Sequence, residues 1–188
     1  MKKTIVMILM AVGLAFAGNA SAQTFGGPES MKGKVVVGGD FNLGFYGNTF
    51  NIGVAPQAGY RLTRSLEAGV RLGYDMFFSR DYYYGNYFSH IFSGAAYLNF
   101  EVFSGIYLQV EDEEMCLLIS GKDIEASAPT WYNSVMAGIG YRQYWNNNYT
   151  FYSLLYNFSW DYDSPYNSPF VVRVGFCYAL KNGKEKQQ

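Results

Sequence analysis

The chain is 188 residues long and has a formal net charge of −1; it is 15% charged and 19% aromatic, with 18 tyrosines. An ordinary soluble domain is ~25% charged, so this chain has too few charged side chains to cover a water-exposed surface of its size. The near-neutral balance and the lack of a Lys/Arg run exclude an electrostatic nucleic-acid binder.

Residues 1–22 have the features of a secretory signal peptide. Two lysines precede an apolar run over residues 5–17, and Ala20-Ser21-Ala22 forms a suitable cleavage site. The apolar run is shorter than the ~20 residues that a membrane-spanning helix requires. We therefore expect export through a cleaved signal peptide, followed by a periplasmic lead-in over residues 23–33.

The remaining chain alternates apolar and polar residues, as β-strands do when one face meets an apolar medium. The clearest example is residues 50–74, where two alternating runs flank a polar turn at residues 62–65. In chain order, the alternation predicts eight strands, at residues 34–45, 50–61, 66–75, 90–103, 106–119, 131–142, 151–160 and 170–180.

Two positions interrupt this pattern. Asp112-Glu113-Glu114 breaks the fifth strand, which indicates either a bulge or the exit of the strand from an apolar layer. Pro56 lies inside the second strand and removes a ladder hydrogen bond, so we expect a local irregularity there.

The connections between predicted strands also follow a pattern. After the first hairpin, short turns alternate with longer loops at residues 78–89, 120–130 and 161–169. Bacterial outer-membrane barrels have short periplasmic turns and longer outer loops. We therefore predict an all-β fold, an eight-stranded antiparallel up-and-down transmembrane β-barrel over residues 34–180, with a periplasmic tail at residues 181–188.

A soluble, lipocalin-like barrel is the alternative, with the apolar face directed inward around a ligand. Its other face would then meet water and be rich in Lys, Glu, Thr and Gln. Here that face consists mainly of Gly, Ala, Ser and Asn with a few charges. Small residues suit the narrow interior of an eight-stranded barrel, which favours an apolar face in contact with lipid.

The same alternation directs a set of charged residues into the barrel. Acids and arginines are balanced among them, and their neighbours are small or uncharged, so we expect a network that plugs the interior. This set is Asp40, Arg61, Glu67, Arg71, Asp75, Glu101, Glu111, Arg142 and Arg173. Because the first and last strands must pair to close the barrel, Asp40 and Arg173 are expected to contact each other directly.

Two stretches of the second and third strands carry a family resemblance. They read Pro56-x-x-Gly59-Tyr60-x-Leu62-Thr63 and Leu66-x-x-Gly69-x-x-Leu72-Gly73-Tyr74. This pattern resembles the small OmpA- and OmpX-type outer-membrane β-barrels, without a peptidoglycan-binding domain. The last strand, with Arg173, Gly175, Tyr178 and Leu180, is similar to the signal read by the outer-membrane assembly machinery. The resemblance implies an outer-membrane location and contact with that machinery.

Catalytic and metal-binding groups are sparse in the sequence. His90 is the single histidine, and lipid A-modifying hydrolases of this kind of barrel place a His and a Ser on one strand face. Ser89 and Ser93 lie at odd spacing from His90 and therefore face the opposite side. We expect no enzyme, metal or cofactor.

Cys116 and Cys177 are predicted to lie near opposite rims on strands that are not neighbours, too far apart for a disulfide.

The sequence leaves the biological role open between three classes. Tyrosines cluster in two predicted outer loops, at Tyr82, Tyr83, Tyr84 and Tyr87 and at Tyr162 and Tyr166. They are expected either to contact lipopolysaccharide, a matrix or a host surface, or to form the aromatic girdle of the membrane surface. A structural or surface-interaction role of a monomeric barrel is favoured, since eight strands leave an interior filled by side chains. A narrow OmpW-like conduit for small apolar solutes and a lipid-modifying enzyme are the alternatives.

Overall fold

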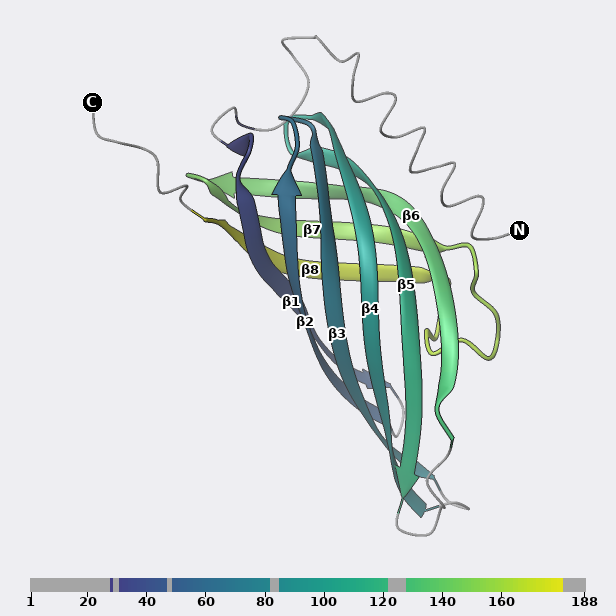
Figure 1. The fold of residues 1–188 in the computed structure, drawn as a ribbon. Helices are drawn as coiled ribbons and strands as arrows, with labels where there is room; N and C mark the ends of the chain where they lie inside the picture. The colour runs from purple at the N-terminus through teal and green to yellow at the C-terminus, as the bar shows by residue number, and fades with distance from the viewer. Residues whose placement is uncertain (1–27, 29–30, 47–48, 82–84, 122–127, 181–188) are drawn as a thin grey trace, which may run out of the picture.

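The computed structural model describes residues 28, 31–46, 49–81, 85–121 and 128–180. It is a closed antiparallel barrel in which each strand pairs with its sequence neighbours and the first pairs with the last (Figure 1). The expected eight-stranded barrel is therefore confirmed. The strands are β1 (Val35–Tyr46), β2 (Thr49–Arg61), β3 (Leu66–Asp81), β4 (Gly85–Phe103), β5 (Ile106–Gly121), β6 (Thr130–Trp145), β7 (Asn148–Asn157) and β8 (Phe170–Ala179).

The strands differ strongly in length, and this shapes the two ends of the barrel. β3 to β6 have 16 to 19 residues, whereas β7 and β8 have 10 each. The long strands extend well past the ends of β7 and β8 (Figure 1). We call the end that carries the tight turn at Ser104 and Gly105 the turn end, and the opposite end the loop end.

The prediction of a long loop over residues 78–89 is wrong in its bounds. β3 and β4 remain paired up to Asp81↔Gly85, so most of this segment is strand. The error arose because aromatic residues occupy both faces there, which hides the alternation that marks a strand. The aromatic side chains still contact across the ladder, as in the ring pair of Phe78 and Phe88 at 5.1 Å.

The bulge that was one explanation for the interrupted pattern of the fifth strand does not exist. β5 pairs without a shift with β4 and β6 through residues 111–115, so no bulge occurs there, and the exit of the strand from an apolar layer stays a prediction. A register irregularity lies instead between Glu101 and Phe103 of β4. The irregularity expected at Pro56 is confirmed, because the β2–β3 ladder lacks pairs at Ala55 and Pro56 while its register is kept.

Each strand directs one face inward and one outward, as its alternation predicts. β8 alternates strictly between exposed and buried residues from Phe170 to Tyr178. Outward residues include Leu72, which is 64% exposed, and Val172, which is 71% exposed. Within the described residues, no helix is long and apolar enough to cross a bilayer.

The turn end is closed by apolar packing that the sequence did not predict. Met31, from the predicted lead-in, is fully buried against Val36, Tyr149, Phe151 and Cys177. The backbone holds this segment in place, since Gly33 N–H donates to Arg61 O at 2.8 Å. Met31, before β1, therefore fills the interior at this end of the barrel.

Glycines on the inner wall make room for inward tyrosine rings. A Cβ atom at Gly140 would lie 2.2 Å from Cζ of Tyr107, and one at Gly69 would lie 2.4 Å from the same atom of Tyr97. Both tyrosines are almost fully buried. The wall is thus flat where the rings lie against it, which lets bulky side chains fill a narrow bore.

We expect Gly140→Val to destabilise the barrel by about 1–3 kcal/mol, because the added atoms displace the Tyr107 ring from a packed interior. The free energy of urea unfolding in lipid vesicles measures this effect. Gly94→Ala is the matched control, since its Cβ would meet nothing closer than Leu72 Cδ2 at 3.9 Å. Equal stability of the two variants would contradict the packing described above.

Candidate functional site

Toward the turn end, two arginines and two glutamates form a fully buried group that we call the lower layer. Its members are Arg61, Glu67, Glu101 and Arg142, each 0–2% exposed. Arg61 reaches both acids, with Nη2 3.0 Å from Glu101 Oε2 and Nε 3.3 Å from Glu67 Oε2. Arg142 Nη2 lies 2.9 Å from Glu67 Oε1. The layer is therefore neutral and cross-linked through its carboxylates.

Tyrosines surround this lower layer. The Arg142 guanidinium lies 4.6 Å from the ring centroids of both Tyr107 and Tyr149, a position favoured by the negative faces of the rings. Tyr149 also donates its hydroxyl hydrogen to Glu67, at 3.1 Å from Oε2. Tyr144 donates to Glu101 Oε2 at 2.5 Å. Ring packing and hydrogen bonds together hold the charged groups in one arrangement.

A second charged group, the upper layer, lies farther toward the loop end. It consists of Asp40, Arg71, Glu111, Glu113 and Arg173, each at most 8% exposed. Arg71 binds Asp40 through two bonds of 3.0 and 2.9 Å and reaches Glu113 Oε1 at 3.1 Å. Arg173 binds Glu111 and lies 3.5 Å from Glu113 Oε2. Three acids thus face two arginines.

The prediction that Asp40 and Arg173 contact each other directly is wrong. Across the β1–β8 ladder, Asp40 lies opposite Gly175, whereas Arg173 is two residues farther along β8. Each arginine instead reaches across the bore to an acid on another strand. Arg71 of β3 forms an ion pair with Asp40. Arg173 forms ion pairs with Glu111 and Glu113 of β5.

The structure directs all nine predicted charged residues to the interior, and it adds Glu113. Asp75 lies at the cavity described below rather than inside either layer. Glu113 was missed because the run Asp112-Glu113-Glu114 resembled a break in the strand. The signal was present, since Glu113 follows Glu111 by two residues and must share its face. Asp112 and Glu114 point outward, and Asn133 Nδ2 donates to both, at 2.9 and 3.2 Å.

Little space remains between the two layers. A cavity of about 10 Å³ lies there, lined by Gln57, Asn99, Tyr107, Gln109, Arg142, Tyr149, Phe151 and Arg173. This volume accommodates about one water molecule.

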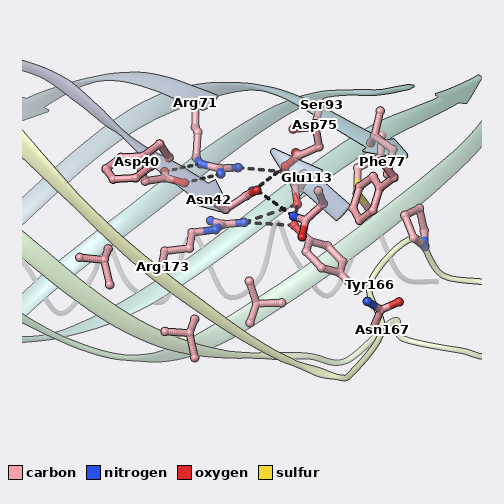
Figure 2. A pocket seen from close by; sticks show the side chains of 18 of the residues that line it. Asp40, Asn42, Arg71, Asp75, Phe77, Ser93, Glu113, Tyr166, Asn167 and Arg173 are labelled. Atoms are coloured by element: carbon pink, nitrogen blue, oxygen red, sulfur yellow. Dashed lines mark hydrogen bonds and ion pairs between the residues drawn. The ribbon is translucent and has the colours of Figure 1, made fainter. Parts of the chain in front are cut away.

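Above the upper layer lies an outer cavity of about 270 Å³ (Figure 2). Asp40, Arg71, Glu113 and Arg173 form its floor, and their side chains converge as Figure 2 shows. Asp75 lines it and accepts a hydrogen bond from Asn42 Nδ2 at 2.5 Å.

The tyrosines predicted as surface contacts fall into three groups. Tyr162 is 95% exposed, as a surface residue should be. Tyr166 is turned inward instead: its hydroxyl donates to Glu113, and Trp160 Nε1 donates to its carbonyl at 2.8 Å. Burial raises the pKa of Tyr166, in the loop after β7, so the hydroxyl remains a donor. Tyr82, Tyr83 and Tyr84 and the side chain of Tyr87 lie outside the described residues.

The remaining candidate groups are one histidine and two cysteines. His90 Nδ1 lies 2.9 Å from the Tyr74 hydroxyl. Cys116 and Cys177 are free thiols, as predicted. No group of three His, Cys, Asp or Glu side chains in the described part of the chain is arranged to hold a metal ion.

The fold and interior define a closed eight-stranded barrel with charged layers across its bore. No model of a known protein family matches the chain, and no curated protein matches it. Among solved structures, it is similar to the N-terminal β-barrel domain of Pseudomonas aeruginosa OprF. The match covers 79% of this chain and 98% of that one, at 14% identity and a TM-score of 0.45.

Proposed function

We propose that this chain is an outer-membrane β-barrel protein with a structural or surface-interaction role, its interior plugged by two charged layers. The supporting observation is the inverted polarity of the barrel. Phe41, Leu72 and Val172 are 64–71% exposed on the outward face, while Arg61 and Glu67 are completely buried inside. A soluble barrel has the opposite arrangement, and a lipid-facing band is what a transmembrane barrel requires.

The plug supports a structural role over transport. Removing hydration from an ion costs many kcal/mol, and the two layers leave room for about one water between them. An apolar solute would meet carboxylates and guanidinium groups across the bore. We therefore propose a structural or surface-interaction role first. A conduit for small apolar solutes is the second candidate, and a lipid-modifying enzyme is the third.

The location proposal also fixes an orientation. The turn end, with Ser104 and Gly105, faces the periplasm, and the loop end faces the outside of the cell, because outer-membrane barrels have short periplasmic turns. Tyr162, fully exposed in the loop between β7 and β8, would then be available for contacts with lipopolysaccharide, a matrix or a host surface.

Epitope tags test this orientation. One tag is inserted within residues 122–127, between β5 and β6, and another is attached after Gln188, in separate full-length chains. We expect antibody to detect the first tag on intact cells and the second only after the outer membrane is permeabilised. Detection of the C-terminal tag on intact cells would show an inverted barrel. Recovery of the protein in the soluble fraction would contradict the membrane location.

A further inference from the structure

The ladder that closes the barrel, between β1 and β8, is the shortest of the eight. It contains five residue pairs, ending at Asp40↔Gly175, whereas β1 and β2 share twelve. β1 nevertheless continues to Tyr46, and β8 already begins at Phe170. Within these two described strands, the seam is therefore paired toward the turn end and unpaired toward the loop end.

The outer cavity lies at the unpaired part of this seam. Its lining includes Asp40 and Arg173, which point into the barrel, and Phe41 and Val172, which point outward and are 69% and 71% exposed. Asn42 is exposed although its place in the alternation directs it inward. A cavity lined by residues of both faces reaches the unpaired edges of the two strands. The seam is thus a lateral opening between the interior and the outward surface.

An opening at this position has a physical cost in a membrane. The facing edges of β1 and β8 leave backbone N–H and C=O groups without a partner strand, and each such group costs several kcal/mol in hydrocarbon. The outward neighbours Phe41, Leu43, Val172 and Val174 are all apolar and exposed. A molecule with a polar part in the opening would hydrogen-bond these backbone groups. Its apolar part would cover the exposed apolar side chains beside them.

The charge of the cavity indicates which polar part fits. Three carboxylates, of Asp40, Asp75 and Glu113, line it together with two arginines, Arg71 and Arg173. Asp40 and Glu113 are paired with those arginines. Asp75, in contrast, has a hydrogen bond from Asn42 but forms no ion pair among the described residues. The cavity therefore has one carboxylate available to a cation.

We propose that the lateral opening between β1 and β8 binds an amphiphile with an ammonium head group. The head lies at Asp75, between the aromatic side chains of Phe77 and Tyr166, which also line the cavity and favour a cation. The apolar chain lies across Phe41, Val172 and Val174 on the outside. This inference rests on the proposed function, because it takes the outward apolar face to be in contact with lipid.

Photochemical labelling of the full chain in lipid nanodiscs tests the proposal. Three probes carry the same diazirine: dodecylammonium, its neutral counterpart dodecanol, and phosphatidylethanolamine. We expect the ammonium probes to label residues 41–43 and 170–174 roughly fivefold more than the alcohol does. Labelling by dodecylammonium alone would identify a free amine as the ligand, and labelling by both ammonium probes would identify a membrane lipid.

Asp75→Asn should remove the preference for the ammonium probes. Asp112→Asn is the matched control, because it neutralises an outward carboxylate of β5 that is bonded to Asn133, and it should leave labelling unchanged. Equal labelling by the alcohol, labelling spread evenly around the barrel, or an unchanged preference in Asp75→Asn would overturn the proposal. Heat-dependent electrophoretic mobility shows whether each barrel has folded. A chain that does not insert contradicts the membrane proposal as well, whereas an inserted barrel without selective labelling contradicts only the ligand site.

Discussion

Arg142→Met is expected to destabilise the barrel by about 3–5 kcal/mol, because it leaves a buried carboxylate without compensation. Arg142 is 2% exposed and binds Glu67 at 2.9 Å. The substitution also removes the cation from between the rings of Tyr107 and Tyr149. The free energy of urea unfolding in lipid vesicles is the quantity to compare.

A second variant separates lost charge compensation from lost packing. Adding Glu67→Gln to Arg142→Met leaves Arg61 and Glu101, which form their own 3.0 Å pair, so the lower layer is neutral again. The double variant should therefore be more stable than Arg142→Met alone, because coupled sites are not additive. A double variant as unstable as the sum of both single changes would show that the lower layer is not an electrostatic unit.

Replacing both Arg71 and Arg173 with Ala should have the largest effect on stability of any change in the upper layer. Asp40, Glu111 and Glu113 would then face one another without a cation, and each uncompensated buried charge costs about 3–5 kcal/mol when its partner is removed. We expect the temperature at which electrophoretic mobility changes to fall strongly. Tyr162→Ala, at an exposed position, is the control and should leave that temperature unchanged.

The same double variant tests whether the layers act in series. The lower layer contains neither of the two replaced arginines, and its four charged groups pair among themselves. Any Arg71→Ala/Arg173→Ala barrel that remains folded should therefore still carry no steady current. Steady current through the folded variant would show that the upper layer alone closes the bore.

Most of the fold could be predicted from the alternation of apolar and polar residues in the sequence. Successive strand side chains point to opposite faces, so the positions of Leu72 and Arg71 on opposite faces follow directly from the chain. The same rule predicted the interior charges but not their partners. Arg71 pairs with Asp40, 31 residues away, and only the stagger of the strands decides which long side chain reaches which acid.

Two features could not be predicted because they lack a local signal. Tyr166 lies in a loop, where no periodicity indicates whether a side chain turns inward. The seam depends on how far β1 and β8 pair, and the sequence of Phe41 to Leu43 alternates in the same way whether or not a strand lies beside it. Long-range pairing, rather than residue preference, determines both.

Conductance of the unmodified protein in a planar lipid bilayer tests the central claim most directly, that this barrel spans a membrane and is closed. With insertion verified by protease protection of the same preparation, two ion-paired charge layers and a cavity of about 10 Å³ between them predict no steady current. Stable channels of large, uniform conductance would contradict the closed barrel and favour transport of solutes through its interior.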